Sequence, residues 1–191
     1  MSSVGAIARR ELRSSFNSPV ASIVAIFFLV ITSTLFFYGR QFFAQDVASL
    51  RGYFASWPLV FVILLPAITM RSWAEERSSG TAEILLTLPM RESELVLGKF
   101  LGSFALLCII VALTLPVPFS AALLGSFEPG QIASQYIGAL LLGCTGIAAG
   151  LFVSALCTNQ VSAFLFSALF LLFITMIGQV PSLMVLPGWL S

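Results

Sequence analysis

Long apolar runs separated by short polar segments make up most of the chain. A membrane-spanning helix needs roughly 20 mostly apolar residues, and five runs come close to that length. They cover residues 19–38, 53–70, 100–124, 135–156 and 161–178. The runs are continuous rather than alternating, and an open sheet would leave backbone groups unpaired in lipid. The pattern therefore predicts an all-α integral membrane protein, a polytopic helical bundle formed as one domain over residues 1–191.

The composition agrees with a protein that uses lipid as part of its solvent. Hydrophobic residues make up 59% of the 191 residues and charged residues 9%, whereas soluble domains carry about 25% charged residues. So much apolar surface cannot be hidden in a core of this size. The formal net charge of +1 gives no reason to expect a nucleic acid partner.

The positive charges predict the orientation of the spans. With the N-terminus in the cytoplasm, the inner segments hold seven of the nine basic residues. These seven are Arg9, Arg10, Arg13, Arg71, Arg77, Arg91 and Lys99, and the outer segments hold Arg40 and Arg51. Cytoplasmic segments of membrane proteins carry an excess of Lys and Arg, so a cytoplasmic N-terminus is expected.

The first residues predict a short amphipathic helix over residues 1–18, lying in the membrane interface. Apolar residues recur there at helical spacing, at Val4, Ile7, Ala8, Leu12 and Phe16. The basic residues Arg9, Arg10 and Arg13 gather on the other side together with Asn17. A generic topology anchor is the alternative interpretation. A cleaved signal peptide is not expected, because residues 20–38 are of full spanning length and no small-residue cleavage site follows.

Prolines and glycines mark three of the runs and also interrupt the apolar end of the chain. Pro66, Pro116 and Pro118 can kink their helices. Gly138, Gly143, Gly146 and Gly150 permit close helix packing in lipid, which serves either static packing or a moving interface. Residues 179–191 are apolar but contain prolines and a glycine, so a re-entrant hairpin, an interfacial segment and the start of a sixth span all remain open.

The polar segment over residues 71–99 holds five of the eight acidic residues of the chain. Ser72 followed by Glu75 fits a capping box at a helix start. Gly80 fits a break or C-cap, and a short helix is expected over residues 81–88 with Ile84, Leu85 and Leu88 on its apolar face. Pro89 ends that helix, and a further helix from about Arg91 leads into the third span. This layout is typical of a docking element rather than a shapeless tether.

Four sequence patterns resemble the ABC-2 type permeases, and most closely the permease associated with gliding motility. The most specific is E-E-R-x-x-G-T-x-E-x-L-L-x-x-P over residues 75–89, followed by E-L-V-L-G-K over residues 94–99. Residues 8–19, 57–76 and 154–164 resemble the family's interfacial helix, second span and turn between spans four and five. Members usually have six spans, so the resemblance implies that the five expected here are five of six.

The resemblance implies a partner ATPase and names the residues that contact it. The coupling helix would be residues 81–88, inserted in a cleft of a separate ABC ATPase subunit. This chain itself would lie in the bacterial cytoplasmic (inner) membrane. The docking residues are then Glu75, Glu76, Arg77, Gly80, Thr81, Glu83, Leu85 and Pro89. A second permease copy or a paralogue, and membrane lipid, are the other expected partners.

Several kinds of chemistry have no support in the sequence. The chain has no His, and none of its three Cys forms a CxxC pair, so no catalytic, metal or cofactor residue is expected. The Gly98-Lys99 pair is followed by Phe100, which does not fit a phosphate-binding loop. Ionisable residues are missing from the middle of the spans, which counts against an ion-coupled carrier. The expected function is the permease subunit of an ATP-driven exporter; a membrane anchor or assembly subunit without an ATPase, and a secondary carrier, remain alternatives.

Overall fold

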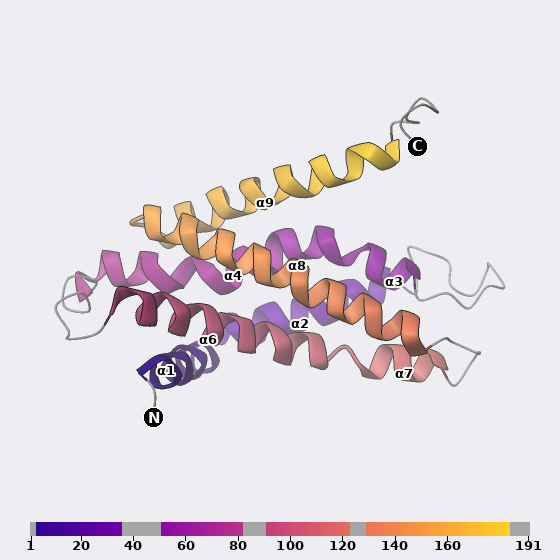
Figure 1. The fold of residues 1–191 in the computed structure, drawn as a ribbon, viewed down its shortest axis with the longest axis horizontal. Coiled ribbons are helices and arrows are strands. Elements are labelled where there is room, and N and C mark those ends of the chain that lie inside the picture. The colour runs from indigo at the N-terminus through magenta and orange to yellow at the C-terminus, as the bar shows by residue number, and fades with distance from the viewer. Residues whose placement is uncertain (1–2, 36–50, 82–90, 123–128, 184–191) are drawn as a thin grey trace.

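The computed structural model describes residues 3–35, 51–81, 91–122 and 129–183, and all elements in these ranges are helices (Figure 1). In chain order they are α1 (Ser3–Asn17), α2 (Pro19–Thr34), α3 (Arg51–Ala55), α4 (Trp57–Ser78), α6 (Glu92–Ala112), α7 (Pro116–Ala122), α8 (Pro129–Leu156) and α9 (Gln160–Leu183). The predicted all-α class is confirmed.

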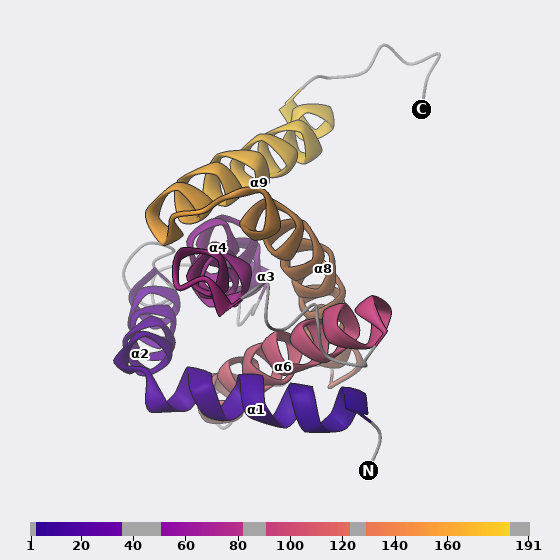
Figure 2. The same ribbon diagram turned by 90° about the vertical axis from the view of Figure 1, so that its left-hand side faces the viewer.

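Four stretches are long and apolar enough to cross a membrane: Trp57–Ser78, Glu92–Ser120, Pro129–Leu156 and Gln160–Gly178. A fifth candidate is the bent pair of α1 and α2, whose axes meet at 76°. Figure 2 shows α1 lying across one end of the bundle, while α2 runs along it. Four of the five predicted spans are therefore confirmed as candidates, and the bent pair is the candidate for the fifth.

No new helix begins at Ser72, so the predicted capping box is wrong. Helix α4 continues without a break to Ser78, because Arg71 and Glu75 pair across one helical turn and favour the helix. Helix α4 ends just before Gly80, the residue expected to mark a helix end. Gly80 has φ = 71°, the left-handed conformation that commonly follows a helix C-terminus. The predicted helix over residues 81–88 lies almost wholly outside the described residues.

Helix α4 is the central element of the bundle. Figure 2 looks nearly along it and shows α2, α6, α8 and α9 around it. Its buried side chains include Trp57, Phe61, Leu64 and Leu65. A helix that is apolar on all sides is typical of a core helix. Pro66 lies inside α4 and is buried.

Glycines set the distance between α8 and its neighbours. A Cβ atom added at Gly143 would collide with the end of the Leu107 side chain, and one at Gly146 with the end of Leu65. At Gly150 it would collide with Thr69 Oγ1 and lie 3.1 Å from Thr69 Cβ. The expected close packing is therefore present at three of the four glycines; Gly138 has nothing within 4 Å of such an atom.

We expect Gly150→Ala to lower the free energy of unfolding by about 1–3 kcal/mol, the usual cost of overpacking. Thr69 cannot move aside easily, because it is branched at Cβ and its hydroxyl donates to the Leu65 carbonyl at 3.0 Å. The matched control is Gly138→Ala on the same helix, which should leave stability unchanged or raise it slightly. Unfolding in detergent measures both; equal effects of the two substitutions would contradict this account of the packing.

An aromatic cluster closes the bundle at the end opposite α1. The Trp57 ring lies 5.4 Å from Phe28 and 5.6 Å from Tyr136, measured between ring centroids in edge-to-face geometry. Tyr136 shares a 3.0 Å hydrogen bond with Thr114, where α6 ends. The chain turns there, and α7 begins at Pro116, so the break expected at the prolines of the third run is confirmed. The cluster ties α2, α4, α6 and α8 together.

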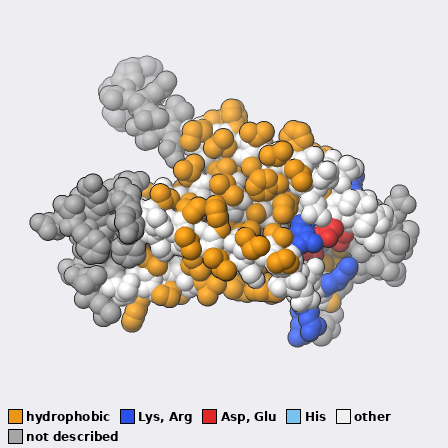
Figure 3. Space-filling view, turned by 180° about the vertical axis from the view of Figure 1, so that it is seen from behind, with side chains coloured by type: hydrophobic (Ala, Val, Ile, Leu, Met, Phe, Trp, Pro, Cys, Tyr) orange, Lys and Arg blue, Asp and Glu red, His pale blue; other side chains and the backbone are white. Residues whose placement is uncertain are grey.

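The surface separates into an apolar band and a charged end. Hydrophobic side chains cover the middle of the face in Figure 3, and the Lys, Arg, Asp and Glu side chains gather at one end of it. Exposed residues of the band include Ile23, Leu141, Phe166 and Phe173, and lipid is the medium that accepts them. The expected docking residues that the structure describes, Glu75, Glu76, Arg77, Gly80 and Thr81, lie at or just after the end of α4.

Candidate functional site

Three helices bring their charges together at one end of the bundle. Helix α1 crosses α6 directly, because α6 has glycine at the two points of contact. A Cβ atom at Gly98 would lie 2.6 Å from Ile7 Cβ, and one at Gly102 would lie 2.7 Å from Glu11 Cβ and 3.0 Å from the Ala8 carbonyl. Part of the predicted apolar face of α1 therefore packs on protein, while Phe16 is exposed.

Lys99 lies at the centre of this region and is buried, with 1% of its surface exposed. Its ammonium Nζ lies 2.9 Å from Glu76 Oε2 and 3.9 Å from Glu11 Oε2. It also donates to the Ser72 carbonyl at 2.5 Å and lies 4.7 Å from the centroid of the Trp73 ring. A buried charge is tolerated only when it is paired and hydrogen-bonded. We call Lys99, Glu76 and Glu11 the Lys99 triad.

The triad joins α1 to α4 by a second contact. The Ser72 hydroxyl donates to Glu11 Oε1 at 3.0 Å, so both carboxylate oxygens of Glu11 are engaged. The predicted helix cap is thus an interhelical hydrogen bond. The side chains of Glu76 and Glu11 keep 17% and 22% exposure, which places the triad just below the surface of the charged end.

A separate ion pair fixes the join between α1 and α2. Arg71 makes a bidentate contact with Glu75, with Nε–Oε2 and Nη2–Oε1 distances of 2.9 Å. Its Nη1 also donates to the hydroxyl of Ser18, which is the N-cap residue of α2 and accepts from the Val20 amide. Bidentate geometry fixes orientation as well as distance, so α4 positions the corner where the chain turns by 76°.

Helix α8 is attached to the same end of α4 through Ser154. Its hydroxyl accepts from the Trp73 and Ala74 amides at 3.3 Å and donates to the Met70 carbonyl at 3.2 Å. The adjacent turn is closed by Asn159 Oδ1, which accepts from the Val161 amide at 3.0 Å and caps α9. A serine with these partners has a structural role.

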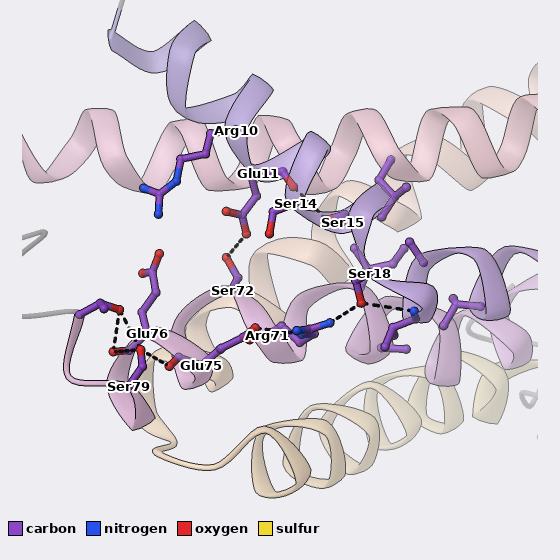
Figure 4. A pocket seen from close by; sticks show the side chains of 17 residues that line it. Arg10, Glu11, Ser14, Ser15, Ser18, Arg71, Ser72, Glu75, Glu76 and Ser79 are labelled. Carbon is purple, nitrogen blue, oxygen red and sulfur yellow. Dashed lines mark hydrogen bonds and ion pairs between the residues drawn. The ribbon is translucent and has the colours of Figure 1, made fainter.

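A cleft of about 240 Å³ opens between α1 and α4 at the charged end (Figure 4). Arg10 points from α1 into the cleft, opposite Glu76 on α4. Most of the lining residues are polar, and the apolar ones include Val24, Ile68 and Leu106. Among the described residues there is no cluster of His, Cys, Asp or Glu suited to a metal ion. Lys99 forms ion pairs with Glu76 and Glu11 on two other helices, whereas Arg71 pairs with Glu75 within α4.

The predicted docking residues fall into three groups. Arg77 and Thr81 are exposed, and Glu75, although paired with Arg71, keeps 45% side-chain exposure. Glu76 faces inward to Lys99, and Gly80 forms the turn. Glu83, Leu85 and Pro89 lie outside the described residues. On α1, Arg9, Arg10 and Arg13 are all exposed, as expected for the polar side of a surface helix.

The sequence did not lead us to predict the interhelical contacts of Lys99, Glu11 and Ser154. Two features of the sequence pointed to Glu11 and Lys99. Glu11 is the one acidic residue between Arg10 and Arg13 in a basic segment, and Lys99 stands in a G-K-x-x-G arrangement, in which glycines four apart mark a helix-packing face. Neither signal identifies the partner helix, because the contacts join residues far apart in the chain.

Comparison with known proteins shows which sequences this chain resembles. A sequence model of the family described as "ABC-2 family transporter protein" matches residues 40–191. The chain is 27% identical over 177 residues to a protein of Pseudomonas aeruginosa described as "Probable ABC transporter permease protein NosY". That alignment covers 84% of this chain and 62% of the relative. The chain therefore spans less than two thirds of the length of that relative.

Proposed function

Since this chain belongs to the ABC-2 family of transporter proteins, of which it is a membrane-spanning permease subunit, we propose that it serves an ATP-driven exporter. A partner ABC ATPase hydrolyses the ATP, and the permease converts the movement of that partner into transport of a substrate outward. A second permease copy or a paralogue completes the path. The subunit lies in the bacterial inner membrane with its N-terminus in the cytoplasm. A closer relation to the gliding-motility permeases is supported by the motif over residues 75–89.

The observation that carries this proposal is the end of α4. The central helix of the bundle presents Arg77 on its surface and ends at Ser78, and Gly80 forms the turn that follows. A rigid helix that ends in a surface segment transmits a push better than a flexible tether. Because α4 is packed against α2, α8 and α9, a displacement of its end reaches the helices that surround it. The transport cycle is then a shift between two packings, biased by ATPase contacts.

A cysteine accessibility experiment tests the orientation and the docking surface together. In a background without native cysteines, Ser78→Cys marks the charged end, and Gln135→Cys marks the opposite end; both positions are exposed. A membrane-impermeant maleimide should label Gln135→Cys in intact cells and Ser78→Cys in inverted vesicles. Stripping peripheral proteins from those vesicles should raise the labelling of Ser78→Cys several-fold and leave Gln135→Cys unchanged. The reverse sidedness, or labelling of Ser78→Cys that stripping does not change, would contradict the proposal.

A further inference from the structure

We infer that Lys99 is a positioning residue, which holds α1 and the end of α4 together. Both then move as one unit when the ATPase moves the docking segment, by which we mean residues 77–89. This inference rests on the proposed function for the source of the movement. The claim that the Lys99 triad fixes α1 to the end of α4 rests on the geometry of the triad alone.

The first argument is the number of helices that meet at one ammonium group. Lys99 comes from α6, Glu11 from α1, and Glu76, Ser72 and Trp73 from α4. An ammonium is a compact point charge with three donors, so it can satisfy partners on two neighbouring helices at once. No other described ion pair joins three helices in this way.

The second argument is that α1 packs mainly on α6 and little on α4. The helix touches α6 at Gly98 and Gly102, where small residues bring the backbones close. Ile7 and Ala8, the apolar residues of this contact, are only half-buried, and Phe16 is exposed. Van der Waals contact fixes the distance between α1 and α6, and the charged contacts of Glu11 add the link to α4.

The third argument is the place of Glu76 in the chain. It lies four residues before Gly80, in the last turn of α4, directly before the docking segment. Glu75 on the same turn pairs with Arg71 and through it contacts Ser18. Glu76 is thus linked through Lys99 to Glu11 of α1, and Glu75 is linked through Arg71 to Ser18 at the α1–α2 corner. Movement of the docking segment therefore carries α1 with it while the triad is intact.

The test removes every charge of the triad, so that no buried charge is left without a partner. In the variant Glu11→Gln/Glu76→Gln/Lys99→Met, hydrogen exchange of the amides of residues 4–17 should be about tenfold faster or more than in the native chain. Exchange in α8 should not change. The control Glu92→Gln removes an exposed charge near the start of α6 and should leave α1 exchange as it is. Equal α1 exchange in native chain and triple variant would overturn the inference.

A measurement of the distance between α1 and the end of α4 distinguishes a positioning role from a purely structural one. If Lys99 only stabilised the fold, the triple substitution would not change how this distance responds to nucleotide. Spin labels at Arg13→Cys and Ser78→Cys, both exposed, report on α1 and the end of α4 in the complex with its co-purified ATPase. In the native background, adding a non-hydrolysable ATP analogue should leave this distance unchanged. In the triple variant, the analogue should shift or broaden it. A shift in the native background, or none in the triple variant, would overturn the inference. Absence of a co-purified ATPase instead contradicts the proposed function, and the exchange experiment still decides the role of the triad.

Discussion

Replacing Lys99 with Met is expected to lower the free energy of unfolding of the permease by about 3–5 kcal/mol, the usual cost of removing one partner of a buried ion pair. The methionine fills a similar volume, so little cavity forms. The loss comes from Glu76 and Glu11, whose carboxylates keep their places beside an apolar side chain. Titration with a denaturing detergent, followed by tryptophan fluorescence, measures the change, since Trp73 lies beside Lys99.

The control for this prediction is Arg77→Met, which removes an exposed cation from the last turn of α4. Its effect should stay within about 0.5 kcal/mol, as for most surface substitutions. Neutralising Glu76 and Glu11 as well should recover most of the stability lost in Lys99→Met, because well-packed neutral groups often replace a buried ion pair at no net cost. A Lys99→Met variant as stable as Arg77→Met would show that the triad does not stabilise the fold.

Reversing the charges of the docking segment is expected to release the ATPase. The double variant Arg77→Glu/Glu83→Lys should lower ATPase recovery about tenfold or more, because like charges placed opposite each other at an interface cost several kcal/mol. Membrane insertion should not change. Glu76 is a poor choice for this experiment, although the sequence motif includes it, since its reversal would place a second cation beside Lys99 and disturb the permease itself.

Arg40→Glu is the matched control for the Arg77 reversal. It makes the same change in charge in a segment that the sequence places on the other side of the membrane. ATPase recovery with Arg40→Glu should equal that with the native chain. Equal recovery from the control and from the docking double variant would mean that residues 77 and 83 take no part in the interaction.

Most of the helices of the bundle could be predicted, because a membrane span is determined by the hydrophobicity of residues that are consecutive in sequence. Each apolar run needs only its own 20 or so residues to become a span, and the run over 135–156 corresponds to the described helix Pro129–Leu156. Helix ends were harder to predict. Ser72 has the spacing of a capping residue, yet it lies within α4, since α4 is already helical before it and the Arg71–Glu75 pair supports continuation. Gly80 was predictable because its left-handed conformation is a property of glycine itself.

Only part of the candidate site could be predicted, because some of its residues are neighbours in sequence and others are far apart. The residues of the motif are neighbours in sequence, so the docking segment could be recognised before its shape was known. The Lys99 triad joins positions 11, 76 and 99, and sequence alone gives no distance between them. Lys99 in particular resembled one of many charges in a polar loop, whereas the structure buries it beneath α1.

The most direct measurement of the central claim is recovery of the tagged chain from its host membranes in mild detergent, with mass spectrometry of the proteins that accompany it. The account predicts an ABC ATPase in near-equal amount to the permease, and hydrolysis of ATP by that complex. A preparation that contains no ATPase, even after mild cross-linking, would contradict the account and favour a membrane anchor or a carrier driven by an ion gradient.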